Sequence, residues 1–161
     1  MLKIRRGERQ DLPAVLLLIQ ELALYEKAPH EVTNTVEDME RDGFGSHPIY
    51  FLWVAEKNEK IVGIAICYIR YSTWKGQMLY LEDIVVTEKE RGKKIGHQLM
   101  NTVIQFAQEE QYNGLIWQVL DWNEPAIRFY KKYNAQFDGE WFNAKLNKEQ
   151  LQQFQTQDAS I

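Results

Sequence analysis

The pattern of apolar and polar residues near the start of the chain predicts two helices. Apolar residues recur at helical spacing over residues 12–26, and Asp11 is expected to be the N-cap of that amphipathic helix. A second helix is expected to begin at Thr35, whose spacing to Asp38 resembles a capping box. It should end near residues 41–48, where glycines and a proline interrupt regular structure.

The middle of the chain is expected to form strands and then a helix. Residues 49–57, 61–72 and 77–86 are rich in β-branched and aromatic residues, and the polar residues between the first two stretches predict a hairpin. One stripe of apolar residues along 93–110 predicts an amphipathic helix, and a further strand is expected over 115–120. This order places antiparallel strands before a β-α-β crossover.

Shorter elements are expected at both ends. Residues 2–6 are strand-like, and residues 124–133 are expected to form a short helix with Asn123 as its N-cap. Residues 135–146 suggest a hairpin or strand pair, and residues 147–157 a C-terminal helix. The whole pattern predicts an α/β (α+β) fold, in which the crossover helix packs against one face of a mixed sheet.

Composition and charge narrow the class of protein. The 161 residues suit a single domain over 1–161, and 45% hydrophobic with 26% charged residues is typical of a globular protein. A net charge of −4 argues against general nucleic-acid binding and is compatible with a cationic ligand. The N-terminus lacks the pattern of a signal peptide, and no apolar run approaches the roughly 20 residues that span a bilayer. We therefore expect a cytoplasmic protein that does not bind membranes.

The cysteine and histidine content predicts that the protein binds no metal. Cys67 is the one cysteine and lies in an apolar strand, so a buried thiol is favoured over a nucleophile, and an internal disulfide is excluded. The three histidines are not spaced as metal ligands.

The turn over residues 87–96 has two interpretations. It joins an apolar strand to an amphipathic helix, and a helix N-terminus with Arg91, Lys93 and Lys94 nearby attracts anions. It matches neither the Walker loop nor the dinucleotide fingerprint. An anion site and an ordinary basic surface turn therefore both remain open.

Glu82 and Asp83 interrupt an otherwise apolar strand. Because successive strand residues face opposite sides of a sheet, at most one of the two carboxylates is expected on a given face. A half-buried carboxylate costs free energy unless it is paired. The carboxylate on the half-buried face is thus either part of a structural salt bridge, or a base or anchor for a cationic substrate.

Two aromatic residues also allow two interpretations. Tyr130 sits at helical spacing and is either a core residue or an acid that protonates a leaving thiolate. Trp74, beside a turn, either packs in a loop or binds an alkylammonium group through cation–π attraction.

Several of these segments, in this order, resemble one superfamily. "LYLEDIVV", "RGKKIG", "WNEPA" and "FYKKYNA" are similar to the motifs of the GCN5-related N-acetyltransferases (GNAT). With "ELALYEK", "DGFGSHPIYFLWVAE" and "YSTWKG", the chain resembles the diamine acetyltransferases of the spermidine/spermine type, and the last motif is similar to the thialysine N-acetyltransferase branch. The resemblance extends over roughly residues 3–142.

The resemblance implies a fold and a reaction. The GNAT fold is a mixed, twisted sheet that splays in its middle, is flanked by helices on both faces and holds acetyl-CoA in the gap. The implied activity is transfer of an acetyl group to a primary amine of a diamine, polyamine or thialysine-like amino acid, by direct attack in a ternary complex. Family members are typically homodimers. A peptide or protein N-acetyltransferase and a non-catalytic acyl-CoA sensor remain alternatives.

The resemblance also implies roles for individual residues. Tyr130 matches the general acid, and Glu82 matches the carboxylate that binds the amine and helps to remove its proton through water. The substrate pocket is expected to include Tyr25, Glu26 and Trp74. The residues expected to bind acetyl-CoA are Ile84, Val85, Val86, Arg91, Gly92, Lys93, Lys94, Ile95, Gly96, His97, Asn123, Glu124, Pro125 and Ala126.

Two positions depart from the family pattern. Lys94 stands where the motif has a second glycine. We expect it to be tolerated, because φ is negative in the first turn of a helix, and its ammonium group has the reach to contact a phosphate of the cosubstrate. Ser72 stands where the polyamine-specific enzymes have an aspartate, which weakens the case for long polyamines and favours a shorter amine.

Overall fold

The structure, a computed structural model, describes residues 1–154 and divides the chain into two compact units, Met1–Gln118 and a second unit that begins at Val119. The first unit contains most of the regular structure. Its elements are β1 (Leu2–Arg6), α1 (Leu12–Tyr25), α2 (Val36–Phe44), β2 (Phe51–Lys57), β3 (Lys60–Ser72), β4 (Gly76–Val86), α3 (Ile95–Glu109) and β5 (Leu115–Ile116). The second contains α4 (Glu124–Lys131) and α5 (Lys148–Gln153).

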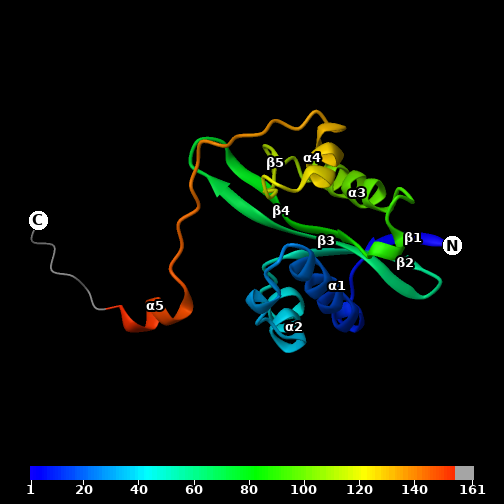
Figure 1. Ribbon diagram of the computed structural model, residues 1–161, viewed down its shortest axis with the longest axis horizontal. Coiled ribbons are helices and arrows are strands. Elements are labelled where there is room, and N and C mark those ends of the chain that lie inside the picture. Colours follow the sequence, from blue (N-terminus) through cyan, green and yellow to red (C-terminus); the bar gives the residue numbers. More distant parts are fainter. Residues whose placement is uncertain (155–161) are drawn as a thin grey trace, which may run out of the picture. The chain divides into compact units, whose positions relative to one another are not determined.

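The five strands of residues 1–154 form one mixed sheet, as expected of the sheet type, and their order is β1-β2-β3-β4-β5 (Figure 1). Neighbours from β1 to β4 are antiparallel, and β4 and β5 are parallel. The hairpin between β2 and β3 is confirmed, with Asn58 and Glu59 at φ of 51° and 61°. Two successive left-handed residues match the right-handed twist of the flanking strands, which favours this tight turn.

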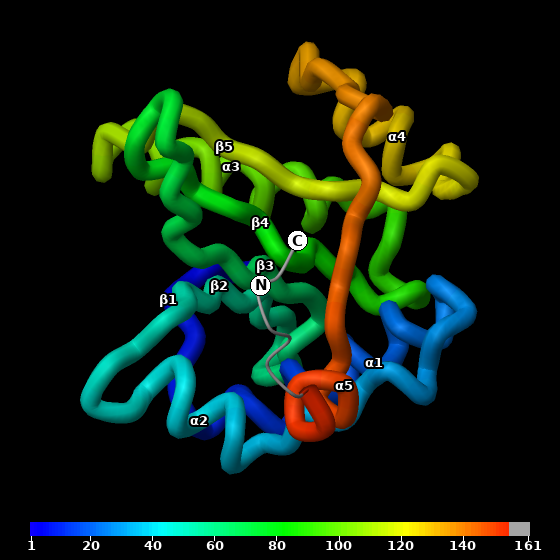
Figure 2. The backbone as a smooth tube through the Cα atoms, turned by 90° about the vertical axis from the view of Figure 1, so that its left-hand side faces the viewer, coloured from blue at the N-terminus to red at the C-terminus, as the bar shows by residue number. Residues whose placement is uncertain are grey.

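Helices cover both faces of the sheet in the first unit. In Figures 1 and 2, α1 and α2 lie on one face and α3 lies on the other. The face under α1 and α2 is an apolar core of buried side chains, which are Leu12, Val15, Leu18, Met39, Leu52, Val54, Ile64, Ile66 and Val85. The periodicity of α1 therefore reports its contact with the sheet.

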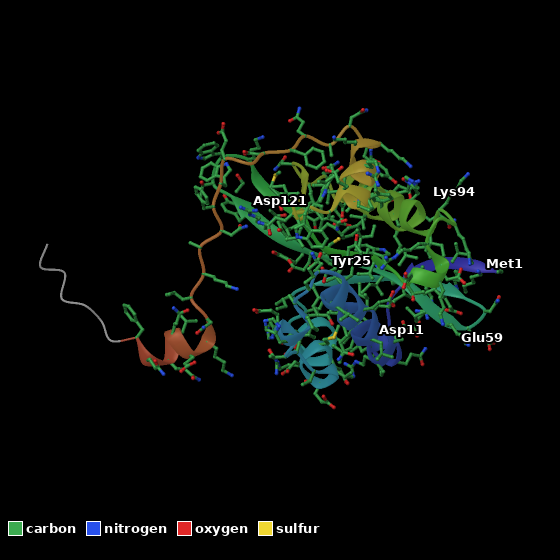
Figure 3. All side chains as sticks on the ribbon, viewed as in Figure 1. Met1, Asp11, Tyr25, Glu59, Lys94 and Asp121 are labelled. Atoms are coloured by element: carbon green, nitrogen blue, oxygen red, sulfur yellow. The ribbon has the colours of Figure 1, made fainter. Side chains whose placement is uncertain are left out.

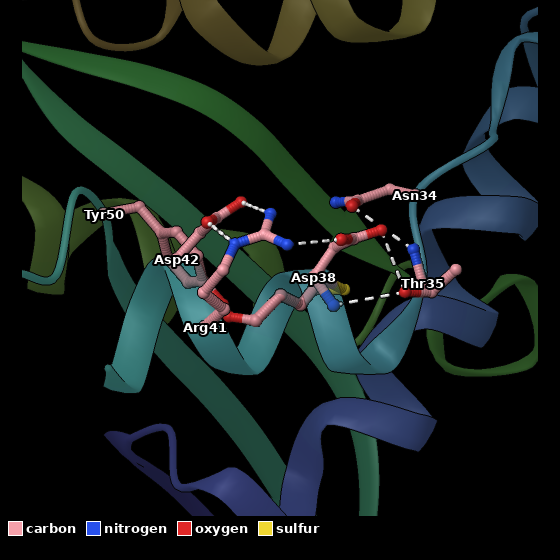
Figure 4. Close-up of polar contacts among 7 residues, drawn as sticks. Asn34, Thr35, Asp38, Arg41, Asp42 and Tyr50 are labelled. Carbon is pink, nitrogen blue, oxygen red and sulfur yellow. Dashed lines mark hydrogen bonds and ion pairs between the residues drawn. The ribbon is translucent and has the colours of Figure 1, made fainter. Parts of the chain in front are cut away.

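The predicted start of α2 is confirmed. The Thr35 hydroxyl accepts a hydrogen bond from the Asp38 N–H at 3.1 Å and donates one to the Asp38 carboxylate at 2.9 Å (Figure 4). Arg41 pairs with both Asp38 and Asp42 one turn further on. These local contacts satisfy the helix start without help from the sheet.

Asp11 occupies the N-cap position of α1, as predicted, but its side chain forms no cap hydrogen bond to the helix. Its carboxylate accepts two hydrogen bonds from Arg5, at 2.7 and 2.9 Å, and one from the Glu8 N–H at 2.8 Å. Asp11 is buried, and the charge-assisted hydrogen bonds from Arg5 hold the pKa of its carboxyl below the ordinary value. A bidentate partner on β1 therefore outcompetes the local cap.

In the second unit, the N-cap of α4 is confirmed. Asn123 Oδ1 accepts a hydrogen bond from the Ala126 N–H at 3.3 Å, and Pro125 lies in the first turn. The predicted C-terminal helix over 147–157 is present as α5, while residues 155–157 lie outside the described residues.

Two predicted strands differ in the structure. The strand over 115–120 is limited to Leu115–Ile116, and the strand pair over 135–146 is wrong, since no described residue of that stretch is in a strand. Two of its hydrogen bonds are local: the Asp138 carboxylate accepts from the Glu140 N–H and from the Trp141 indole, both at 3.0 Å. A strand needs a partner backbone, and side-chain hydrogen bonds to nearby donors compete with it.

Candidate functional site

The sheet opens along one edge of β4. Only Leu79 and Tyr80 pair with β5, opposite Leu115 and Ile116. Within residues 1–154, the remainder of β4 from Leu81 to Val86 is paired on one side, with β3. The splayed sheet that the resemblance implied is therefore present in this unit.

The open edge presents backbone groups of the strand. The Thr87 N–H donates to Val62 O of β3 at 2.9 Å, so alternation turns Val85 toward β3 and turns Ile84 and Val86 toward the open side. Val85 also packs in the core. Ile84 and Val86 are thus the predicted cofactor-contacting residues of this strand whose N–H and C=O groups face the gap.

A β-bulge lies at the point where the sheet opens. Ile66 is opposite Asp83 whereas the next residue, Cys67, is opposite Leu81, so Glu82 is an extra residue in β4. One extra residue shifts the alternation of side chains along the strand.

This bulge overturns the expectation that at most one of the two carboxylates lies on a given face. Before the bulge, Glu82 has the orientation of Tyr80, which is opposite Tyr68 on β3. After it, Asp83 has the orientation of Val85, whose side chain packs in the core against α1. Both carboxylates are therefore directed to the face that α1 covers.

Asp83 lies within the electrostatic influence of two other carboxylates. Burial, and then the negative charges of Glu82 and Glu26, raise the pKa of Asp83 to about 6. Burial also raises the pKa of Glu26, at the end of α1. The structure therefore brings the predicted residues Glu26 and Glu82 into one electrostatic environment, with Asp83 as an additional member. A cation bound there would relieve their mutual repulsion.

Two tyrosines border these carboxylates and were not predicted. The rings of Tyr68 and Tyr80 lie 5.1 Å apart, centroid to centroid. Burial and then the charge of Glu82 raise the pKa of Tyr68 to about 12. The signal in the sequence was the pair of aromatic residues opposite each other in neighbouring strands, but it became informative only with the register.

The turn after β4 has an unusual backbone. Gly92 has φ of 77°, and Lys94, the N-cap of α3, has φ of 64°. The expectation of a negative φ at Lys94 is therefore wrong: the residue precedes the first helical position, Ile95, and adopts the left-handed conformation that glycine favours. The side chain of Lys94 extends outward from the turn (Figure 3).

The geometry of this turn suits an anion. Left-handed residues interspersed among right-handed ones gather backbone N–H groups into a concave surface, and the start of α3 adds further donors. A Cβ at Gly92 would meet nothing within 4 Å, so the space beside it is open. Ile95, Gly96 and His97 form the first turn of α3. The residues present thus fit the phosphates of acetyl-CoA.

The basic side chains of the turn have partners within the chain. Arg91 Nε donates to Val86 O at 3.0 Å, and the Arg91 guanidinium lies 5.3 Å from the centroid of the Tyr25 ring. Lys93 Nζ lies 3.1 Å from a carboxylate oxygen of Glu90. Tyr25, predicted in the substrate pocket, is thereby also a neighbour of this turn.

Trp74 lies apart from the carboxylates in the described chain. It occupies the turn between β3 and β4, its side chain is 85% exposed, and its N–H donates to the Ser72 hydroxyl at 3.3 Å. The six residue-to-residue steps along the strand from Gly76 to Glu82 span roughly 20 Å. A place for Trp74 in the same pocket remains a prediction.

The remaining predicted residues belong to the second unit and are described within it. Asn123 caps α4, whose first turn contains Glu124, Pro125 and Ala126. Tyr130, in the last turn of α4, is buried, and its ring lies 5.3 Å from that of Phe129 in an edge-on arrangement.

Residues 1–154 lack two features that would indicate another kind of site. No helix there combines the length and apolar character needed to cross a membrane. Within the same residues, no three His, Cys, Asp or Glu side chains are grouped so that they could hold a metal ion.

Comparisons with known proteins agree with this geometry. The sequence profile of the acetyltransferase (GNAT) family matches residues 16–135. Thialysine N-epsilon-acetyltransferase of Bos taurus is 39% identical over 141 residues, which are 83% of this chain and 83% of that protein. Spermidine/spermine N(1)-acetyltransferase-like protein 1 of Homo sapiens is 34% identical over 92% of this chain, which spans only 23% of that longer protein.

A solved structure supports the fold. An aminoglycoside acetyltransferase from an uncultured soil metagenomic sample, in complex with trehalose, superposes with a TM-score of 0.76, at 22% identity, over 91% of this chain and 97% of the other. The profile match and the relatives above 30% identity show that the chain belongs to the acetyltransferase (GNAT) family and is an N-acetyltransferase.

Proposed function

We propose that the protein uses acetyl-CoA to acetylate a primary amine of a small amine, either a short diamine or a thialysine-like amino acid. The observation that carries this proposal is the bulge in β4. It turns the side chains of Glu82 and Asp83 to one face, where Asp83 feels the charge of Glu26. At the same point, the edge of β4 that faces away from β3 is no longer paired with β5. A cationic amine and a backbone-bound cosubstrate would thus meet at the same few residues.

Each reacting group has a proposed partner. Acetyl-CoA, when bound, supplies the thioester whose carbonyl carbon is attacked. Glu82 orients the ammonium group and accepts its proton through water, so that the nitrogen lone pair is free. As the new C–N bond forms and the C–S bond breaks, Tyr130 gives its proton to the departing sulfur. The transfer is direct in a ternary complex and forms no acyl-enzyme.

The proposed binding residues follow the open edge and the two helix starts. The backbone N–H and C=O groups of Ile84 and Val86 would hold the pantetheine chain, with Val85, whose own backbone groups face β3, between them. The turn and first helical residues, Arg91 to His97, would hold the pyrophosphate, with Lys94 adding charge. Asn123, Glu124, Pro125 and Ala126, around the start of α4, would contact the cosubstrate further along.

The size of the amine is proposed from two observations. Ser72 leaves the last position of β3 without the carboxylate that would hold a distal ammonium, whereas Glu26 and Asp83 supply negative charge near Glu82. Relatives named thialysine N-epsilon-acetyltransferase in several animals support a short amine. Tyr25, Glu26 and Trp74 are proposed to line the pocket.

We also propose that the two units act as one GNAT domain, because the family profile runs from residue 16 to residue 135 across the boundary at 118.

A homodimer is proposed on the family pattern and is supported by exposed apolar side chains such as Tyr71, Trp74, Trp141 and Phe142. A cytoplasmic location, with neither nucleic acid nor membrane as a partner, completes the proposal. Light scattering after size-exclusion chromatography tests the dimer.

One assay tests the reaction and its rivals. Thiol release from acetyl-CoA is followed with thialysine, lysine, putrescine, spermidine, an aminoglycoside and a lysine-containing peptide. We expect saturable release with one short amine. Release with the peptide alone would support a peptide N-acetyltransferase, and binding of acetyl-CoA without release from any amine would support an acyl-CoA sensor.

A further inference from the structure

One carboxylate outside the proposed binding residues forms hydrogen bonds to the start of the segment that follows β4, which leads into the basic turn at residues 91–94. Glu21 lies on α1, and each of its two carboxylate oxygens accepts a hydrogen bond from the chain that follows β4. Oε2 accepts from the Thr87 hydroxyl at 2.9 Å, and Oε1 accepts from the Glu88 N–H at 2.8 Å. Hydrogen bonds to an ionised acceptor are stronger and more directional than those between neutral groups.

These two donors lie where the strand becomes the turn. Thr87 is the N-cap of the single 3-10 turn η3 (Glu88–Glu90), and its own N–H remains bonded to Val62 O of β3. The first N–H of such a turn lacks an acceptor inside the turn and favours a negative charge. Glu21 supplies that acceptor from another element, so the chain at Thr87 is bound to both β3 and α1.

The same carboxylate also reaches the arginine of the turn. Arg91 Nη2 lies 3.8 Å from Glu21 Oε1, while Arg91 Nε donates to Val86 O and its guanidinium stacks over the ring of Tyr25. Glu21 and Tyr25 are one helical turn apart on α1, so they present a carboxylate and an aromatic ring to one guanidinium. Entry to the turn and the turn's arginine therefore share one anchor.

We propose that Glu21 is a positioning residue for acetyl-CoA. By holding Thr87, Glu88 and Arg91 in place, it keeps the backbone N–H groups of the following turn in the orientation in which they receive the phosphates. This inference rests on the proposed function and extends it to a residue that does not touch the cosubstrate. Pre-organising the turn lowers the ordering cost of binding and leaves the chemical step unchanged.

Calorimetric titration with CoA tests the inference without turnover. The Kd is expected to rise about tenfold in Glu21→Ala, and less in Glu21→Gln, which keeps one acceptor oxygen. In steady-state assays, the KM for acetyl-CoA should rise by the same factor, while kcat and the KM for the amine stay within about twofold of the parent. A purely structural role would instead lower the unfolding midpoint and disturb all parameters together.

Two further variants make the test specific. Glu26→Gln makes the same charge change five residues along the same helix, and should raise the KM for the amine while leaving the Kd for CoA unchanged. Thr87→Val removes one of the two donors and should raise the Kd about threefold. Because Thr87 acts through Glu21, its effect should largely vanish in the Glu21→Ala background, which keeps no acceptor. If Glu21→Ala does not fold, Glu21→Gln and Thr87→Val provide the same test.

The outcomes separate this inference from the proposed function. A parent protein that binds CoA and acetylates an amine, with Glu21 variants that match it, overturns only the role of Glu21. A lower Kd in Glu21→Gln also overturns it, because Glu21 would then withhold Arg91 from the phosphates. A parent that binds no CoA overturns both.

Discussion

Two charged regions lie on either side of the end of β4, and they carry charge in opposite ways. In the first, Glu82 and Asp83 turn to one face near Glu26, and burial and repulsion raise the pKa of Asp83. In the second, the basic turn at 91–94 is exposed to solvent, and its arginine contacts a backbone carbonyl and an aromatic ring. The acidic region brings like charges together, whereas the arginine of the basic turn has favourable partners within the chain.

This difference explains how one strand could bind the two oppositely charged ligands proposed above. The acidic region depends on side chains that a single extra residue brings to the same face, so a cation there removes repulsion. The basic turn depends on backbone conformation at Gly92 and Lys94, so its affinity for an anion comes mainly from N–H groups. Changes of side chain should therefore harm the first region more than the second.

The largest effect should come from outside both regions. Tyr130→Phe is expected to lower kcat about 100-fold, because the departing thiolate loses its proton donor, with the Kd for CoA nearly unchanged. Steady-state kinetics and calorimetry measure the two quantities. Tyr133→Phe, beside the same helix, is the matched control and should retain activity. An unchanged kcat in Tyr130→Phe would remove this residue as the acid.

In the acidic region, Glu82→Gln should raise the KM for the amine about tenfold and move the pH profile of kcat/KM upward, since the ammonium loses both its counter-charge and its proton acceptor. Initial rates over a series of pH values measure both effects. Glu37→Gln, an exposed residue of α2, makes the same charge change and should behave as the parent. Parental kinetics in Glu82→Gln would show that the acidic region does not bind the amine.

The free-energy cost of ionising Asp83 in the folded protein can be measured. Its pKa is raised from 3.8 to about 6, so the folded state is penalised when this group ionises, and stability is lost as the pH rises from about 4 to about 6. Asp83→Asn should therefore unfold at higher urea than the parent at pH 7.5, by at most about 3 kcal/mol, and at the same urea at pH 4. Equal stability of the two proteins at both pH values would mean that burial and the neighbouring carboxylates impose no cost on ionised Asp83.

The smallest effect is expected in the basic turn. Lys94→Gly should raise the free energy of unfolding by about 1 kcal/mol, because it relieves a left-handed backbone at a residue with a Cβ. Loss of the ammonium group should raise the Kd for CoA only about threefold, as is usual for an exposed charge. Urea unfolding and calorimetry measure the two. Tighter binding in Lys94→Gly would show that the lysine obstructs the turn.

Much of the fold was predictable because its signals are local. The stripe of apolar residues in α1, the Thr35 cap of α2 and the Asn123 cap of α4 depend on residues a few positions apart, and all three are confirmed. Asp11 stands at the predicted N-cap position of α1 but does not cap the helix with its side chain, because its stronger partner, Arg5, lies on a strand. The stretch 135–146 has the composition of strands, but composition does not supply a partner backbone.

The amino-acid sequence alone predicts most of the helices and strands, a glycine-containing turn after a strand with two carboxylates, and the resemblance to one family. The pairing of distant segments was needed to show that Glu82 and Asp83 share a face, that Lys94 is left-handed, and that Glu21 binds the start of the turn. The difference is one of range along the chain. Propensities and caps act within one helical turn, whereas a bulge, a strand register and a brace from α1 exist only once distant segments are paired.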